Sequence, residues 1–113
     1  MQKQESQIEG YFVRQFKKYF SSSKKGLLLK YASSTYTGMP DRDVLVKGLP
    51  IIKVELKSPT GRLSAKQKNV HRVLRALGVE VHTFSSKEEV DTFLKDLHVS
   101  YTLGYRIQLN NLK

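Results

Sequence analysis

The sequence contains no cysteine, and this absence excludes two classes of site at once. Without thiols the chain forms no disulfide framework and offers no thiolate ligands for a structural zinc site. It also has no run of apolar residues long enough to cross a bilayer. Its first ten residues, MQKQESQIEG, lack the apolar core of a secretory signal. We therefore expect a cytoplasmic protein.

Acidic residues are scarce compared with basic ones. Ten Asp and Glu stand against 20 Lys and Arg, which gives a formal net charge of +10. Such an excess favours a polyanionic partner, and nucleic acid is the commonest because phosphate contacts release condensed counterions. A membrane surface is a weaker alternative, since the basic residues are spread along the whole chain. A basic domain without any polyanionic partner is the other alternative.

The length of 113 residues predicts one domain. We find no internal repeat, linker or low-complexity segment. The expected domain covers residues 1–98. Residues 99–113 form a polar tail, for which we expect an added strand around 105–109 or a dimer contact.

Hydrophobic periodicity predicts alternating helices and strands. Helical spacing marks a first helix over residues 8–20, a second from Ser64 to just before Gly78, and a third from Ser86. Short apolar or alternating runs mark strands at 27–31, 44–46, 51–57 and 79–84. The apolar face expected for the second helix consists of Val70, Val73, Leu74 and Leu77. This order predicts an α/β or mixed α+β fold with one central sheet.

Two connections organise the predicted sheet. The turn Gly48-Leu49-Pro50 joins two strands as a hairpin. The unit from residue 51 to residue 84 has the order strand, helix, strand, which implies a parallel pair with a right-handed crossover.

The strand Lys53-Val54-Glu55-Leu56-Lys57 contains the most informative pattern. Because side chains alternate across a strand, Val54 and Leu56 enter the core while Glu55 and Lys57 share the opposite face, ~7 Å apart. A carboxylate can hold a divalent cation and a neighbouring lysine can position or deprotonate an attacking water. A solvent-facing Glu-Lys pair is the alternative interpretation.

Asp41 strengthens the catalytic interpretation. The predicted hairpin brings it towards the end of the strand that carries Glu55, so two carboxylates converge. Mg²⁺ prefers oxygen ligands and keeps several waters, so these two groups and the backbone carbonyl of Leu56 suffice. Asp43 is a rival ligand on the same face. Pro40-Asp41 also suits an ordinary turn.

These residues resemble a known nuclease family. The segments 38–42 (GMPDR) and 54–64 (VELKSPTGRLS), followed by Gln67 and His71, are similar to the VRR-NUC (virus-type replication-repair nuclease) domain of the PD-(D/E)xK superfamily. The resemblance runs from about residue 9 to about residue 94. It implies a restriction-endonuclease-like core, a central mixed sheet flanked by helices, and Mg²⁺ or Mn²⁺ as cofactor. It also points towards a phage or bacterial setting.

The resemblance further implies a catalytic set of a first-helix Glu, Asp41, Glu55, Lys57 and Gln67. Glu9 lies on the line of the buried stripe and is preferred as metal ligand, with Glu5 as alternate. Either could instead complement the helix dipole. Gln67 could face the site or, with Ser64, form a capping box.

The expected partner is DNA. We interpret a group of basic residues near the predicted site as phosphate contacts, namely Lys30, Arg42, Arg62, Lys66 and Lys68. His71 could also contact DNA phosphate, or it could lie near the buried face of its helix. Stand-alone members of the family resemble Holliday-junction resolvases, which implies a homodimer acting on four-way junctions in recombination or repair. The alternatives are a flap or single-strand nuclease and a non-catalytic nucleic-acid-binding module, although no aromatic base-stacking platform favours single strands.

Overall fold

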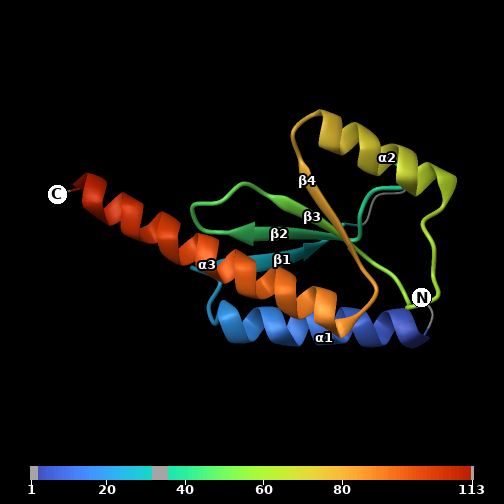
Figure 1. The fold of residues 1–113 in the computed structure, drawn as a ribbon, viewed down its shortest axis with the longest axis horizontal. Coiled ribbons are helices and arrows are strands. Elements are labelled where there is room, and N and C mark those ends of the chain that lie inside the picture. Colours follow the sequence, from blue (N-terminus) through green and yellow to red (C-terminus); the bar gives the residue numbers. More distant parts are fainter. Residues whose placement is uncertain (1–2, 32–35, 113) are drawn as a thin grey trace.

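A computed structural model describes residues 3–31 and 36–112, with side chains described over 5–31 and 36–104. Three helices and four strands follow one another in the order α1 (Lys3–Tyr19), β1 (Gly26–Lys30), β2 (Arg42–Val46), β3 (Ile52–Leu56), α2 (Ala65–Ala76), β4 (Glu80–Phe84) and α3 (Lys87–Leu112). The predicted α+β class with one mixed sheet is confirmed (Figure 1). Among the described residues, no helix is both long and apolar enough to cross a membrane.

The four strands lie in the order β1-β2-β3-β4. β1 pairs antiparallel with β2, β2 antiparallel with β3, and β3 parallel with β4. The hairpin between β2 and β3 turns at Gly48, whose φ of 83° belongs to the left-handed region that glycine adopts without strain. Both predicted connections, the hairpin and the parallel crossover through α2, are therefore confirmed.

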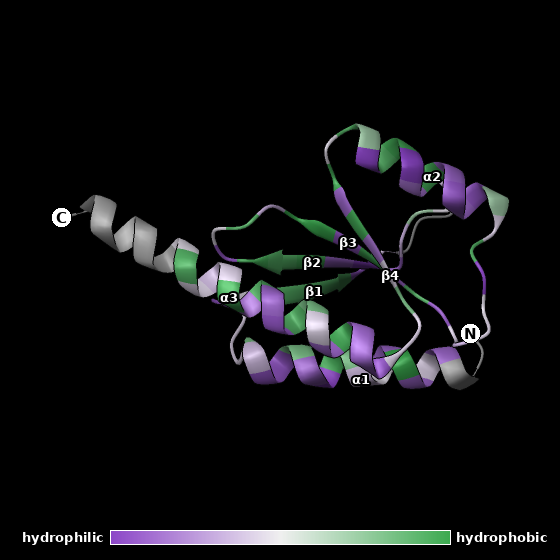
Figure 2. Ribbon diagram, viewed as in Figure 1, coloured by the Kyte–Doolittle hydropathy of each residue, from purple (hydrophilic) through white to green (hydrophobic). Residues whose placement is uncertain are grey.

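The hydrophobic core lies on the sheet face that α1 and α3 cover. Figure 1 shows these two helices side by side below the strands. Ile52, Val54 and Leu56 of β3 point to this face, and Phe12 of α1 is fully buried against Phe84, with ring centroids 6.1 Å apart. Figure 2 shows the same distribution, with strands β1 and β2 largely hydrophobic.

Helix α2 covers the other face of the sheet. Ser64 caps it and forms a capping box with Gln67, and Gly78 follows its end with a φ of 91°. The expected apolar face is wrong in part. Val73 and Leu77 are 41% and 75% exposed, because this short helix contacts the sheet through Val70 and His71 instead.

Helix α3 corrects the interpretation of the C-terminal tail. The backbone stays helical from Lys87 to Leu112, so the strand expected around 105–109 is wrong. The first half of α3 buries Val90, Phe93, Leu94 and Leu97 in the core, as predicted. The helix then continues beyond the core (Figure 1).

Candidate active site

The β2–β3 hairpin brings Asp41 to the end of the strand that carries Glu55. Asp41 directly precedes β2, and the register pairs Arg42 with Val54, so Asp41 lies beside Glu55 and Leu56. The Leu56 backbone N–H donates to Oδ2 of Asp41 over 3.0 Å. The convergence predicted from the sequence is thus present, and one backbone hydrogen bond fixes it.

Glu55 is a buried carboxyl group on the sheet face opposite the core. Its residue is 1% exposed, because α2 lies over this part of β3. Burial, a hydrogen bond with the Asp41 carboxylate and the Asp41 charge together raise the pKa of Glu55 to about 9. Without a bound cation, Glu55 therefore holds a proton at neutral pH.

This pair of carboxyl groups suits a divalent cation chemically. Two acids that compete for a proton in a desolvated position gain most from a nearby positive charge. Their oxygen atoms and the neighbouring backbone carbonyl of Leu56 match the ligand preference of Mg²⁺ and Mn²⁺. Among the described residues, no three His, Asp or Glu side chains gather closely enough to form a ready-made metal cluster. The donor set fits a cation that keeps several of its waters.

Lys57 lies immediately beyond β3. Its backbone N–H donates to the carbonyl of Phe84 over 2.9 Å, which prolongs the pairing of β3 with β4 by one residue. Its charge lowers the pKa of Glu55 against the larger opposing effects, so the ammonium group acts on this carboxyl. Asp41, Glu55 and Lys57 therefore form one group, as the sequence predicted.

The two candidate carboxylates of the first helix have different surroundings. Oε1 of Glu9 lies 2.7 Å from Nη2 of Arg42 and 3.8 Å from Nζ of Lys30. Glu9 is thus engaged by basic side chains of β1 and β2. Glu5, one helical turn earlier, contributes to the raised pKa of Glu55 through its charge. Glu9 is therefore paired with basic side chains, whereas the charge of Glu5 reaches Glu55. Which of the two binds a metal stays a prediction.

His71 takes the second of the two places that the sequence left open for it, at the buried face of α2. It is 1% exposed, and its Nε2 lies 3.4 Å from Oε1 of Glu55. This burial is incompatible with the expected phosphate contact, because the imidazole lies beneath the surface between α2 and β3. Desolvation lowers the pKa of His71, so the ring is neutral at physiological pH.

Gln67 serves the cap of α2. Its Oε1 accepts a hydrogen bond from the Ser64 backbone N–H over 2.9 Å, and its own N–H donates to Oγ of Ser64 over 3.1 Å. Of the two roles that the sequence left open for Gln67, the structure contains the capping box, which engages the Oε1 atom of its side chain.

Comparison with known proteins gives a structural match alone. No protein-family model matches the sequence, and no curated protein matches it. A solved structure described as a VRR-NUC domain superposes with a TM-score of 0.70 at 24% sequence identity. The match covers 81% of this chain and 95% of the other. The chain has the fold of a VRR-NUC domain.

Within this VRR-NUC fold, the basic residues expected to contact DNA divide into two groups. Lys30, Arg62, Lys66 and Lys68 are exposed. Arg42 is instead held by Glu9, with only 16% of its side chain exposed. Asp43, the rival ligand, is bound by Lys53 over 2.7 Å and belongs to a separate ion pair. Lys30, although exposed, also pairs with Glu9, so Arg62, Lys66 and Lys68 are the members of this group left without an ion pair among the described side chains.

Proposed function

We propose that this protein is a metal-dependent DNA nuclease that hydrolyses phosphodiester bonds. One observation carries the proposal: the half-buried Asp41 lies beside the fully buried Glu55 and near Lys57, on the fold of a VRR-NUC domain. Burying a carboxyl group next to a second carboxylate is costly, and such strongly shifted pKa values concentrate at functional sites. A surface Glu-Lys pair, the alternative considered on the sequence, would not leave Glu55 1% exposed.

The residues that would hold Mg²⁺ or Mn²⁺ are Asp41, Glu55, the backbone carbonyl of Leu56 and Glu5. Such a cation supplies polarisation of the scissile phosphate and a lower pKa for its bound water. Glu9 is not included, because Arg42 and Lys30 already compensate its charge. Glu5 lies in the first turn of α1 and is half-buried, so it can turn towards Glu55.

Lys57 acts on the attacking water. Because it follows the same strand face as Glu55, its ammonium group is held beside the carboxyl pair. From there it orients the water through a hydrogen bond and offsets the negative charge that develops on the phosphate oxygens.

His71 holds Glu55 in place. A neutral imidazole with its proton on Nε2 can donate a hydrogen bond to Oε1 of the ionised Glu55 carboxylate. Nε2 and Oε1 lie 3.4 Å apart, so this hydrogen bond can shorten. That contact leaves the second carboxylate oxygen for the cation. Hydrogen bonds of this kind orient metal ligands and tune their affinity.

DNA approaches over the exposed cations around this site. Lys66 and Lys68 lie in the first turn of α2, Arg62 in the loop before it and Lys30 at the end of β1. They position the backbone without reading sequence. The net charge of +10 supports nucleic acid as the substrate. From the resemblance of the sequence to VRR-NUC domains we further propose branched DNA, with a four-way junction as the favoured substrate and a homodimer supplying two sites.

A panel of labelled substrates tests the proposal. Four-way junction, flap, duplex and single strand are each incubated with the wild type in Mg²⁺, Mn²⁺ or Ca²⁺. We expect cleavage of the junction in Mg²⁺ or Mn²⁺. Cleavage restricted to flaps or single strands would contradict the preference for junctions but would still support nuclease activity. Binding without cleavage of any substrate would favour a non-catalytic nucleic-acid-binding module and overturn the proposal that the protein is an enzyme.

A further inference from the structure

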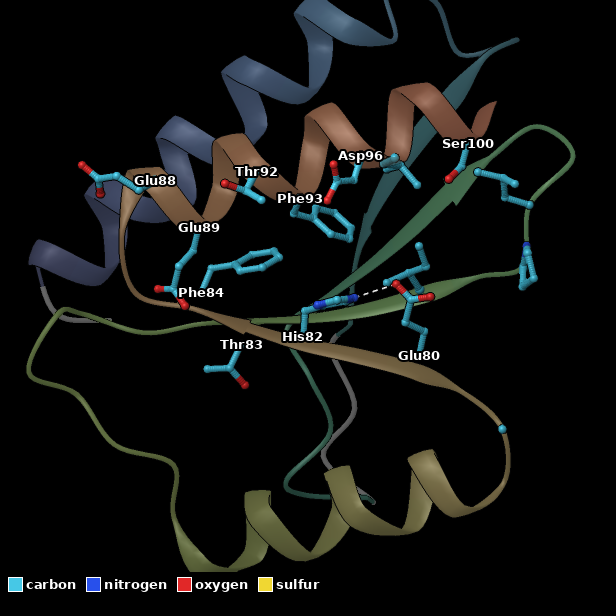
Figure 3. A pocket seen from close by; sticks show the side chains of 15 residues that line it. Glu80, His82, Thr83, Phe84, Glu88, Glu89, Thr92, Phe93, Asp96 and Ser100 are labelled. Carbon is cyan, nitrogen blue, oxygen red and sulfur yellow. Dashed lines mark hydrogen bonds and ion pairs between the residues drawn. The ribbon is translucent and has the colours of Figure 1, made fainter. Parts of the chain in front are cut away.

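A groove of about 730 Å³ lies between β4 and α3, on the sheet face opposite Glu55 (Figure 3). Its floor includes side chains that belong to the hydrophobic core, from β3, β4 and α3: Ile52, Phe84, Phe93 and Leu97. The groove therefore reaches the edge of the core, where these four side chains are only 5–8% exposed. The floor is apolar in character, so it suits an apolar side chain of an occupant.

The polar rim of this groove is acidic. Four of the ten Asp and Glu residues line it, namely Glu80, Glu88, Glu89 and Asp96. Among the described residues that form its lining there is no lysine or arginine, although the chain contains 20. The rim therefore opposes the charge of the rest of the protein. It repels nucleic acid and attracts a cation.

Two of the four carboxylates are already used inside the protein. Glu80 pairs with His82 over 2.6 Å (Figure 3). Glu89 caps α3 through Ser85 and Ser86. In the part of the chain whose side chains are described, Glu88 and Asp96 form no ion pair and no side-chain hydrogen bond. These two carboxylates can therefore meet cations of a partner at no cost to the fold.

The spacing of these two residues determines the size of the occupant. Glu88 and Asp96 are eight residues apart on α3, which corresponds to ~12 Å along a helix. One small cation cannot reach both. A peptide with basic side chains several residues apart reaches both and has room between them for an apolar side chain on the floor.

We propose that this groove, lined by β4 and α3, binds a segment of a partner protein that carries spaced lysine or arginine side chains and at least one large apolar side chain. The charge complementarity of the rim and the apolar floor together select this occupant. Because the groove and the Asp41–Glu55 pair lie on opposite faces of the sheet, the segment and DNA can bind at the same time. The proposal does not depend on nuclease activity.

A peptide selection tests it with the full chain. Random 12-residue peptides displayed on a surface are selected against the immobilised protein, and the enriched peptides are synthesised. We expect a net positive charge and an aromatic or large aliphatic residue in them. Added to ¹⁵N-labelled protein, they should shift the amide signals of Gly78, Thr92 and Ser100, which lie along the groove.

Two substitutions on α3 reverse the same charge inside and outside the groove. Asp96→Lys changes a rim residue, while Asp91→Lys changes an exposed residue outside the groove that accepts a hydrogen bond from the Tyr11 hydroxyl of α1. We expect at least tenfold weaker binding for Asp96→Lys and little change for Asp91→Lys, with both variants checked by thermal unfolding. The proposal would be overturned if both substitutions weakened peptide binding equally. It would also be overturned if the enriched peptides carried no positive charge, or if the amide signals that shift lay outside the groove. Self-association of the wild type that Asp96→Lys abolishes would assign the groove to a second copy and overturn it too.

Discussion

The Asp41–Glu55 pair and the acidic groove both contain carboxyl side chains, but the two environments shift the pKa of these groups in opposite directions. At the pair, one carboxyl group is 1% exposed and burial raises its pKa to about 9. In the groove, backbone and hydroxyl hydrogen bonds from Ser85 and Ser86 lower the pKa of Glu89. The two regions lie on opposite faces of one sheet. Environment, not residue type, decides whether a carboxyl group in this protein holds a proton or a charge.

This contrast explains which region suits chemistry. A buried, protonated Glu55 beside the half-buried Asp41 would gain most from a divalent cation, whose charge would favour loss of the proton. Carboxylates spread along a helix gain little from such an ion and more from spaced basic side chains. The following predictions test that difference, from the largest expected effect to the smallest.

Replacing Asp41 should have the largest effect. Asp41→Asn keeps an oxygen that can accept from the Leu56 N–H but removes the charge, so we expect cleavage to fall about 100- to 1000-fold. Asp43→Asn is the matched control, because Asp43 is bound by Lys53. Single-turnover cleavage in Mn²⁺ measures both. A loss for Asp43→Asn as large as that for Asp41→Asn would remove the distinction between ligand and ion pair.

Replacing His71 should weaken the metal site while leaving its ligands intact. His71→Leu fills the space without a donor, and we expect the Mn²⁺ concentration for half-saturation to rise about 10- to 100-fold. His71→Gln keeps an N–H donor and should recover much of the affinity. Titration calorimetry measures binding, and metal-free thermal unfolding separates a folding defect. Equal affinity in His71→Leu and wild type would show that this contact does not orient Glu55.

The two carboxylates of α1 should separate into a ligand and a structural ion pair. Glu5→Gln should weaken Mn²⁺ binding several-fold with little change in stability. Glu9→Gln leaves Arg42 without its charged partner and should lower the free energy of unfolding by about 1–3 kcal/mol with metal affinity kept. Calorimetry and urea unfolding measure the two quantities. The reverse assignment would restore Glu9 as the helix ligand.

The protonation of Glu55 predicts a pH dependence in the absence of metal. Its pKa is 4.5 when unfolded and about 9 when folded, so between these values the folded protein binds one more proton. Stability should therefore fall as pH rises across this window, by at most about 1.4 kcal/mol per pH unit. Glu55→Gln should lack this slope. If the free energy of unfolding changes with pH in the same way for wild type and Glu55→Gln between pH 5 and pH 9, Glu55 is not protonated in the folded protein.

Much of the fold follows from local patterns. The apolar stripe of α1, the alternation in β3 and the Gly48 turn each act over a few residues, so the sequence predicts them directly. The hairpin then places Asp41 beside Glu55, because antiparallel register follows from the turn. For the same reason, the capping box of Ser64 and Gln67 was visible as a spacing.

Long-range contacts escaped this kind of prediction. The sequence ranked Glu9 above Glu5 because Glu9 lies on the buried stripe, yet that position also meets Arg42 from β2. The place of His71 stayed open between a phosphate contact and the buried face, because nothing local reveals that α2 packs against Glu55. The helical continuation of α3 past residue 99 was missed because its apolar residues are too dispersed to mark a buried face. The acidic rim between β4 and α3 joins residues that only the tertiary fold brings together.

The central claim, that the carboxyl pair and not the groove performs hydrolysis, is tested most directly by one cleavage measurement. Wild type, Glu55→Gln and Asp96→Asn are compared on a labelled four-way junction in Mn²⁺ under single-turnover conditions. We predict equal cleavage by wild type and Asp96→Asn and none above background by Glu55→Gln. Cleavage by Glu55→Gln at the wild-type rate would contradict the claim.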